Sequence, residues 1–176
     1  MTTSLRARPE ASEYAPFFHR YVASVPDGDV VELLRTGGRE LIETIGRIPE
    51  SRGGHRYGPD KWTIRQVIGH LIDAERIFTY RALRIARGDR TPLAPFDENA
   101  YVRTAGSDER TLADLARELE CVREASVRLF ESLPDDAWAL SGIASEREIS
   151  VRALAYITDG HARHHLQILR ERYGVE

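Results

Sequence analysis

The chain has 176 residues, a formal net charge of −3, 41% hydrophobic residues and 30% charged residues. This balance predicts one globular domain over residues 1–176 and excludes a disordered chain. The charge provides no positive field that would attract nucleic acid or an anionic membrane, so neither is an expected partner. No apolar run approaches the roughly 20 residues that span a bilayer. The N-terminus "MTTSLRARPEASEY" lacks the apolar region of a signal peptide, and we predict a cytoplasmic protein.

A single cysteine, Cys121, excludes an internal disulfide and any metal site built from several cysteines. We expect an inert thiol, because no basic cluster adjoins it in its helical segment. Any metal site must therefore use histidine and carboxylate ligands. The basic residues are arginines except for Lys61, and they alternate with acids as on a solvated helix face.

The first predicted element is a short helix within "SEYAPFFHRYV", residues 12–22. We expect it to pack on the outside of the fold, as part of an N-terminal extension over residues 1–24. His19 is then a surface or interface residue.

The first long helix follows "VPDGD", where Asp27 or Asp29 can accept the cap hydrogen bonds, and it ends at Pro49. Its Gly37 and Gly38 form a weak point that could kink the helix.

The second long helix begins at "TIRQ", where Thr63 and Gln66 have the spacing of a capping box, and it ends at Gly88. The segment that follows, residues 91–109, is long, aromatic and interrupted by prolines. Loops of this length tend to be functional or to cover a site.

A third helix is predicted from Thr111 to Pro134, and a fourth from Ser150 to Gly174, with the glycine as C-cap. No segment alternates convincingly between apolar and polar residues, so β structure is minor or absent. The sequence therefore predicts an all-α protein, an up-and-down four-helix bundle with a short extra N-terminal helix.

The fourth helix contains "DGHARHHLQILRERYG", with three of the six histidines within five residues. At about 100° per residue, His161 and His165 fall in the middle of the apolar stripe and His164 falls on its edge. Histidines four apart present their imidazoles to one point and can donate two nitrogens to one cation. Two core histidines with local hydrogen-bond partners are the alternative, and the pair alone leaves both interpretations open.

In "VIGHLIDAERIF" of the second helix, His70 faces a neighbouring helix, as a third ligand or as a packing residue. Gly69 precedes it as Gly160 precedes His161, which indicates close backbone approach, room for a ligand, or simple packing of small residues. Three neutral imidazoles alone would leave a fourth position to water or substrate. Asp73 is a candidate hydrogen-bond acceptor for an imidazole or a general base, although its direction also suits a solvated residue.

Several other site types are absent from the sequence. No Glu-x-x-His occurs, which argues against a di-iron carboxylate bundle. "HARHH" lacks the glutamate of the zinc-protease motif, and there is no nucleophile elbow, P-loop or dinucleotide fingerprint.

The stretches "RYGPDKWTIRQVIGHLIDAERIFTYRALRIARGD" and "GHARHHLQILRERYG" resemble the DinB/YfiT-like superfamily. The likeness extends through "EYAPFFHRYVASVPDGD" and "TPLAPFDENAYV" and covers most of the chain. It implies a four-helix bundle, usually a homodimer, in which three histidines hold a divalent metal. By position these are His70, His161 and His165. Zinc and nickel are the ions we expect, and imidazole ligands also accept copper and iron.

The resemblance gives three hypotheses for function. Some members of the superfamily are transferases or isomerases that use bacillithiol or mycothiol, so the first is a thiol-dependent S-transferase acting on small electrophiles. The second is a metal-activated hydrolase using the same site. The third is a non-catalytic, stress-related bundle with a structural metal or none. In the enzyme hypotheses the partner is a small-molecule substrate, and four aromatic side chains could either shape its pocket or pack: Tyr57, Trp62, Phe96 and Tyr101.

Overall fold

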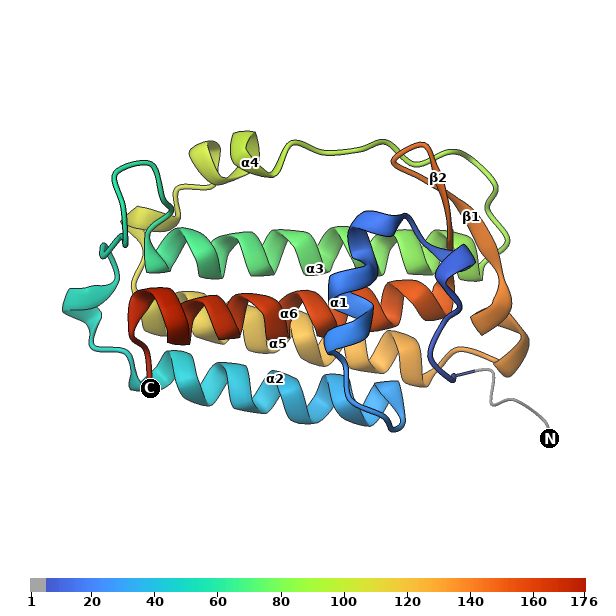
Figure 1. The fold of residues 1–176 in the computed structure, drawn as a ribbon, viewed down its shortest axis with the longest axis horizontal. Coiled ribbons are helices and arrows are strands. Elements are labelled where there is room, and N and C mark those ends of the chain that lie inside the picture. Colours follow the sequence, from blue (N-terminus) through green and yellow to red (C-terminus); the bar gives the residue numbers. More distant parts are fainter. Residues whose placement is uncertain (1–5) are drawn as a thin grey trace.

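The structure, a computed structural model, describes residues 6–176. Its main body is a bundle of four long helices, with two short helices outside it (Figure 1). The long helices are α2 (Val30–Arg47), α3 (Ile64–Ala86), α5 (Leu112–Glu131) and α6 (Val151–Tyr173). The short ones are α1 (His19–Ser24), which overlaps the segment 12–22 predicted to hold the N-terminal helix and ends two residues beyond it, and α4 (Glu98–Thr104). The predicted all-α four-helix bundle with an extra N-terminal helix is confirmed.

Short 3-10 helices occur in the connections of the described chain, at Ala11–Glu13, Pro16–Phe18, Glu50–Arg52, Ser107–Glu109 and Asp135–Ala139. None of the helices within residues 6–176 combines the length and the apolar character needed to cross a bilayer.

The order of the helices around the bundle is set by the long segment between α3 and α5. α2 packs against α5 and α6, and α3 packs against the same two helices. α3 and α5 run in the same direction, because residues 87–111 carry the chain back along the outside of the bundle (Figure 1). Parallel neighbours need such a crossover connection. The strict alternation of an up-and-down bundle is therefore interrupted between α3 and α5.

Side-chain caps fix where all four long helices begin, and at the start of α5 Thr111 accepts from the amide of Asp114. Asp29 accepts from the amides of Val31 and Glu32 at the start of α2. Thr63 and Gln66 form both hydrogen bonds of the predicted capping box of α3. At the other end of the chain, Ser150 caps α6 and Gly174 follows it in the left-handed conformation at φ +62°.

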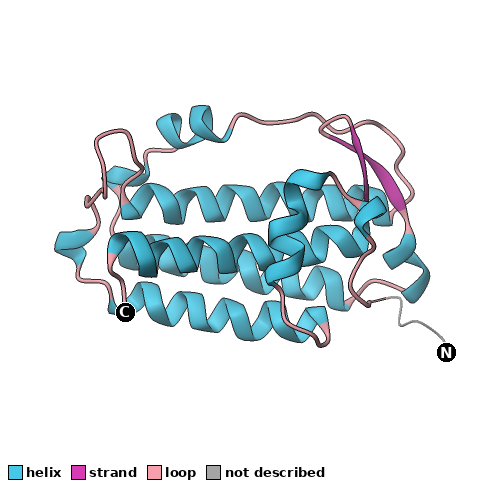
Figure 2. Cartoon of the chain, in the orientation of Figure 1, coloured by secondary structure: helices cyan, strands magenta, loops and turns pink. Residues whose placement is uncertain are grey.

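A small antiparallel hairpin precedes α6 (Figure 2). Strand β1 (Ser141–Ala144) pairs with β2 (Arg147–Ser150), with Ala144 opposite Arg147 next to the turn. The turn residues Ser145 and Glu146 have φ values of 51° and 64°. Leu93 of the crossover segment pairs with this hairpin, its amide donating to Ile143 O and its carbonyl accepting from Ser145 N. The crossover segment is thereby tied to the hairpin beside the bundle.

The apolar core consists of two clusters, one towards each end of the bundle. Three helices contribute buried charged side chains near the boundary between the clusters: Glu75 on α3, Arg123 on α5 and Asp159 on α6. Arg123 donates to both Glu75 carboxylate oxygens at 2.8 Å. The glycines of α2 make room for this layer, since a Cβ at Gly38 would overlap Arg123 and one at Gly37 would crowd Asp159. The helix continues without interruption through both glycines.

Candidate metal centre

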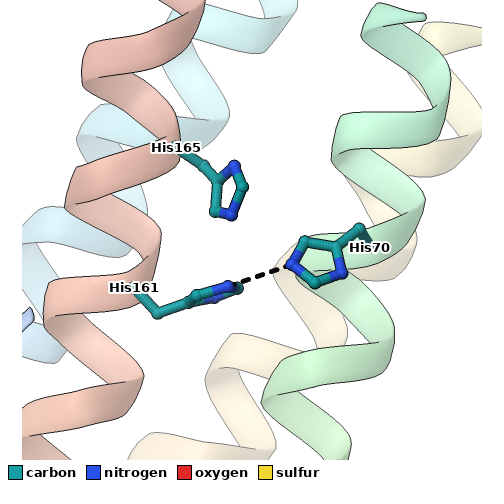
Figure 3. Close-up of side chains that lie close together, drawn as sticks. All are labelled: His70, His161 and His165. Carbon is teal, nitrogen blue, oxygen red and sulfur yellow. Dashed lines mark hydrogen bonds between the residues drawn. The ribbon is translucent and has the colours of Figure 1, made fainter. Parts of the chain in front are cut away.

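Three histidine side chains from two helices converge inside the bundle (Figure 3). His70 extends from α3, and His161 and His165 extend from successive turns of α6. One ring nitrogen of each lies within 4.8 Å of the others. The Nε2 atoms of His70 and His161 are 3.0 Å apart. We call these residues the histidine cluster.

The histidine cluster is buried and uncharged. His70, His161 and His165 are 4%, 6% and 9% exposed. Burial lowers the pKa of His70 to about 4. It also lowers the pKa values of His161 and His165 well below the usual range, and positive charge on neighbouring histidines and on Arg20 acts in the same direction. The imidazoles are therefore neutral at physiological pH, which is the state that binds a metal.

These residues fit a divalent transition metal. Nδ1 of His165 is buried without a hydrogen-bond partner within the described chain. Three buried imidazoles with so few partners are costly, because burial of polar nitrogen must be offset by hydrogen bonds or by a ligand. A set of three neutral imidazoles also matches the donor preference of zinc and related ions, and it leaves a coordination position open.

Two glycines allow other segments to pack directly against the helices beside the histidine cluster. A Cβ on Gly160 would overlap the backbone of Tyr21 in α1, and a Cβ on Gly69 would overlap the side chain of Ser107. Of the alternatives that the sequence left open, Gly160 shows close approach of a backbone and Gly69 shows packing of a small side chain. The approach at Gly160 places α1 beside His161, because Tyr21 packs edge-on against that ring at a centroid distance of 5.3 Å.

Aromatic side chains surround the cluster. The ring centroids of Trp62 and His70 are 4.8 Å apart. Those of Phe78 and His161 are 5.4 Å apart, in an edge-on arrangement. His164 packs against Tyr21 instead of joining the three converging rings. This arrangement agrees with the position of His164 at the edge of the apolar stripe predicted from the sequence.

Two cavities adjoin the cluster on different sides. The first, of about 270 Å³, is lined by His70 and His161 together with α1, α3, the crossover segment and the hairpin turn. The second, of about 240 Å³, is lined by His165. Of the aromatic residues proposed from sequence, Phe96 lines the first cavity, and Tyr57 and Trp62 line the second. Tyr101 contacts the Phe96 ring and is 46% exposed.

Other residues singled out from the sequence lie apart from the cluster. The charges that act on the half-buried carboxyl of Asp73 are those of Arg76 and Glu118, and within residues 6–176 it makes no hydrogen bond to a cluster histidine. Cys121 is an exposed free thiol on α5. His19 is exposed and pairs with the Tyr14 hydroxyl.

Sequence reasoning missed Arg81, which lines the first cavity and is only 4% exposed. A signal was present: Arg81 follows His70 by eleven residues and so returns to within about 20° of its direction on α3. It also stands between Phe78 and Ile85, inside the apolar stripe.

The comparison with known families identifies the family to which the chain belongs. A sequence profile of the DinB superfamily matches residues 33–169, most of the chain. The chain belongs to the DinB superfamily. No curated protein matches it significantly.

Solved structures share the DinB fold seen here. YfiT from Bacillus subtilis, described as a probable metal-dependent hydrolase with an unusual four-helix bundle topology, matches with a TM-score of 0.74 at 20% identity, covering 99% of this chain and all of that one. A mycothiol-dependent maleylpyruvate isomerase matches with a TM-score of 0.66 at 14% identity, covering 78% of this chain. This chain spans 58% of the length of that isomerase. At these identities the likeness establishes the fold.

Proposed function

We propose that this DinB superfamily protein is a divalent-metal-dependent S-transferase, in which His70, His161 and His165 hold the metal and a low-molecular-weight thiol attacks a small electrophile. The observation that carries the proposal is the convergence of three neutral, buried imidazole nitrogens within 4.8 Å of one another. Zinc or nickel suits this donor set. When bound, such an ion lowers the pKa of a thiol or of water at its open position.

The two cavities favour transfer over hydrolysis. Transfer joins two organic molecules, and the histidine cluster has space on both sides, through His70 and His161 on one side and His165 on the other. The thiol sulfur forms a bond to the electrophilic carbon, the leaving group departs with the bonding electrons, and the thiol proton goes to solvent. Trp62 packs against the imidazole of His70, and Phe78 packs against that of His161.

Hydrolysis at the same site is the second candidate function. It is favoured by the description of YfiT, whose whole chain aligns with this one. A hydrolase would turn over an ester or amide without added thiol, whereas a transferase requires both substrates.

The metal content tests the shared basis of both functions. We expect about one equivalent of a transition metal per chain in tag-free protein, as measured by elemental analysis. Each of His70→Ala, His161→Ala and His165→Ala should lose most of it. His164→Ala is the matched control on the same helix and should keep it. Metal-free wild-type protein that cannot be reconstituted with zinc or nickel would contradict the proposal.

Turnover separates the candidate functions. We expect monochlorobimane to be conjugated to bacillithiol or mycothiol by the metal-loaded protein, with loss of activity in the three cluster variants and on chelation. Turnover of esters without thiol would instead favour the hydrolase. Loss of folding on chelation with neither activity would favour a structural metal in a non-catalytic bundle.

A further inference from the structure

Arg81 is a buried cation that has no acidic partner among residues 6–176. Its side chain extends from α3, and the residue is 4% exposed. None of the ion pairs in the described chain includes it, in contrast to Arg123, which pairs with Glu75 in the same bundle. Burial lowers the pKa of Arg81, and no carboxylate acts in the opposite direction. A buried guanidinium normally has a counter-charge, because an unpaired buried charge is costly.

The hydrogen bonds of Arg81 occupy only part of its guanidinium. Nη2 donates to Ala94 O at 2.8 Å and to Ser145 Oγ at 3.0 Å. Nε and Nη1 have no protein acceptor within the described residues, yet they are not among the polar atoms sealed from solvent. Because Arg81 lines the 270 Å³ cavity, these donors are within reach of a molecule bound there.

The same cavity is lined by two members of the histidine cluster, His70 and His161. Arg81 lies eleven residues beyond His70, about 16 Å along the helix at about 1.5 Å per residue. Side chains on a helix tilt towards its N-terminus, so the guanidinium extends back towards the cluster. Phe18 and Phe78 lie on the cavity wall as well. The cavity thus combines the imidazoles, an apolar lining and an unpaired cation.

We propose that Arg81 binds a carboxylate of the small-molecule substrate, so that the substrate is an organic acid whose reacting carbon faces the histidine cluster and is separated from the carboxylate by an apolar spacer. A guanidinium donates charge-assisted hydrogen bonds to a carboxylate, here from Nε or Nη1, because both hydrogens of Nη2 already donate to Ala94 O and Ser145 Oγ. A bound carboxylate would supply the counter-charge that residues 6–176 do not give to Arg81. The identification of the reacting end rests on the proposed function.

The other charged group on the cavity wall is Glu98, which is exposed. Its charge acts on the Tyr21 hydroxyl and is not among the influences on Arg81. Arg20, also exposed, donates to the same hydroxyl at 2.9 Å. Arg20 and Glu98 both act on Tyr21, and within residues 6–176 Glu98 makes no ion pair with Arg81.

Binding of a matched ligand pair tests the inference without turnover. Zinc-loaded protein should bind 4-methylbenzoate about 10- to 100-fold more tightly than 4-methylbenzamide, the difference expected for charge-assisted hydrogen bonds. Calorimetric titration of Arg81→Met should show this preference lost, and Arg81→Lys should keep part of it. Arg76→Met is the matched control, because Arg76 is an exposed arginine of α3 paired with Glu118.

Arg81 also holds the crossover segment and the hairpin turn through its hydrogen bonds. The binding experiment must therefore distinguish carboxylate binding from a purely structural role. That role predicts a lower melting temperature in both Arg81 variants with an unchanged preference for carboxylate over amide, and this outcome overturns the inference. So does failure of the wild type to bind 4-methylbenzoate. A preference that disappears on chelation and persists in both Arg81 variants would assign the carboxylate to the metal, and would also overturn it.

Turnover separates this inference from the proposed function. With bacillithiol or mycothiol, the wild type should convert 4-(bromomethyl)benzoate in preference to 4-(bromomethyl)benzamide by a similar factor. Equal turnover of the two electrophiles overturns the inference and leaves the S-transferase intact. An Arg81-dependent binding preference in protein that binds no metal supports the carboxylate site and overturns the proposed function.

Discussion

The imidazoles of the histidine cluster make metal-free protein sensitive to acid. In the folded state burial lowers the pKa of His70 to about 4 and those of His161 and His165 well below the usual range, against about 6.5 in an unfolded chain. Between about pH 4 and pH 6.5, protons therefore bind the unfolded state more strongly than the folded state. The stability contributed by the neutral imidazoles is present above pH 6.5 and is lost as the pH falls towards about 4.

Urea unfolding of chelator-treated protein at pH 8, 6 and 5 checks this prediction. As the pH is lowered, we expect the free energy of unfolding to fall more steeply in the wild type than in His70→Gln, which lacks one buried titrating group. His19→Asn is the control, because His19 is exposed. An equal slope for wild type and His70→Gln would contradict the prediction.

At the scale of single residues, helical geometry predicted which histidines face inward. Steps of 100° placed His161 and His165 inside the stripe and His164 at its edge, and the structure shows the same arrangement. Arg81 was missed because an arginine inside an apolar stripe is ordinarily taken as a long side chain that reaches solvent. The acceptors that hold it, Ala94 O and Ser145 Oγ, come from segments whose positions the sequence does not reveal.

At the scale of the elements, α1 is held in place by its contact with α6 at Gly160. We expect Gly160→Ala to destabilise the protein by about 1–3 kcal/mol, the usual cost of overpacking, because its Cβ would meet the Tyr21 backbone and force α1 outwards. Gly46→Ala in α2 is the control, since nothing lies within 4 Å of a Cβ there. It should stabilise the helix by about 0.5–1 kcal/mol. Thermal and urea unfolding measure both effects.

The same variant should affect the first cavity, because Tyr21 lines it and contacts His161. Weaker binding of 4-methylbenzoate to Gly160→Ala is therefore expected, with Gly46→Ala unchanged. A Gly160→Ala protein as stable as the wild type would show that α1 can shift without cost.

Helix boundaries were predictable because the caps are local. Thr63 with Gln66, and Ser150 with Gly174, carry their signals within a few residues. The hairpin was not predicted as an element, because its strands have four residues each and its turn lacks the usual Asn-Gly. Ser145 and Glu146 instead adopt positive φ, a conformation that local sequence rarely indicates for these residue types.

At the scale of the whole molecule, Arg123 links the helices between the two apolar clusters, through its ion pair with Glu75 and a longer one of 4.0 Å with Asp159. The side chains of Glu75 and Arg123 are 5% and 6% exposed, and Arg123 also donates to Leu34 O at 3.0 Å. We expect Arg123→Met to cost about 3–5 kcal/mol, because it leaves Glu75 buried and unpaired. The double variant Glu75→Leu/Arg123→Met should recover most of that loss.

Chemical unfolding of the two variants measures this difference. Arg76→Met is again the control, since it breaks the more exposed pair with Glu118 and should change the free energy by at most about 1 kcal/mol. If the double variant is no more stable than Arg123→Met, the unpaired Glu75 is not the cause of the loss. The ion pair would then itself stabilise the bundle.

The overall bundle followed from helical periodicity, but the parallel direction of α3 and α5 did not. Direction depends on where residues 87–111 run, and no local signal gives that path. The length of the segment was the available clue, since a tight turn would make neighbouring helices antiparallel. The homodimer implied by family resemblance stays a prediction, which light scattering after size-exclusion chromatography can test.

The histidine cluster joins positions that are distant in the chain: His70 and His161 are separated by 91 residues. At roughly 5–20 residues per second, ribosomal synthesis needs roughly 5–18 s to pass from one to the other. Throughout that interval α3 offers a single imidazole, which is a poor competitor for metal ions. The complete set of three ligands in the proposed metal site therefore forms only after α6 has docked on α3, in the folded bundle and not on the nascent chain.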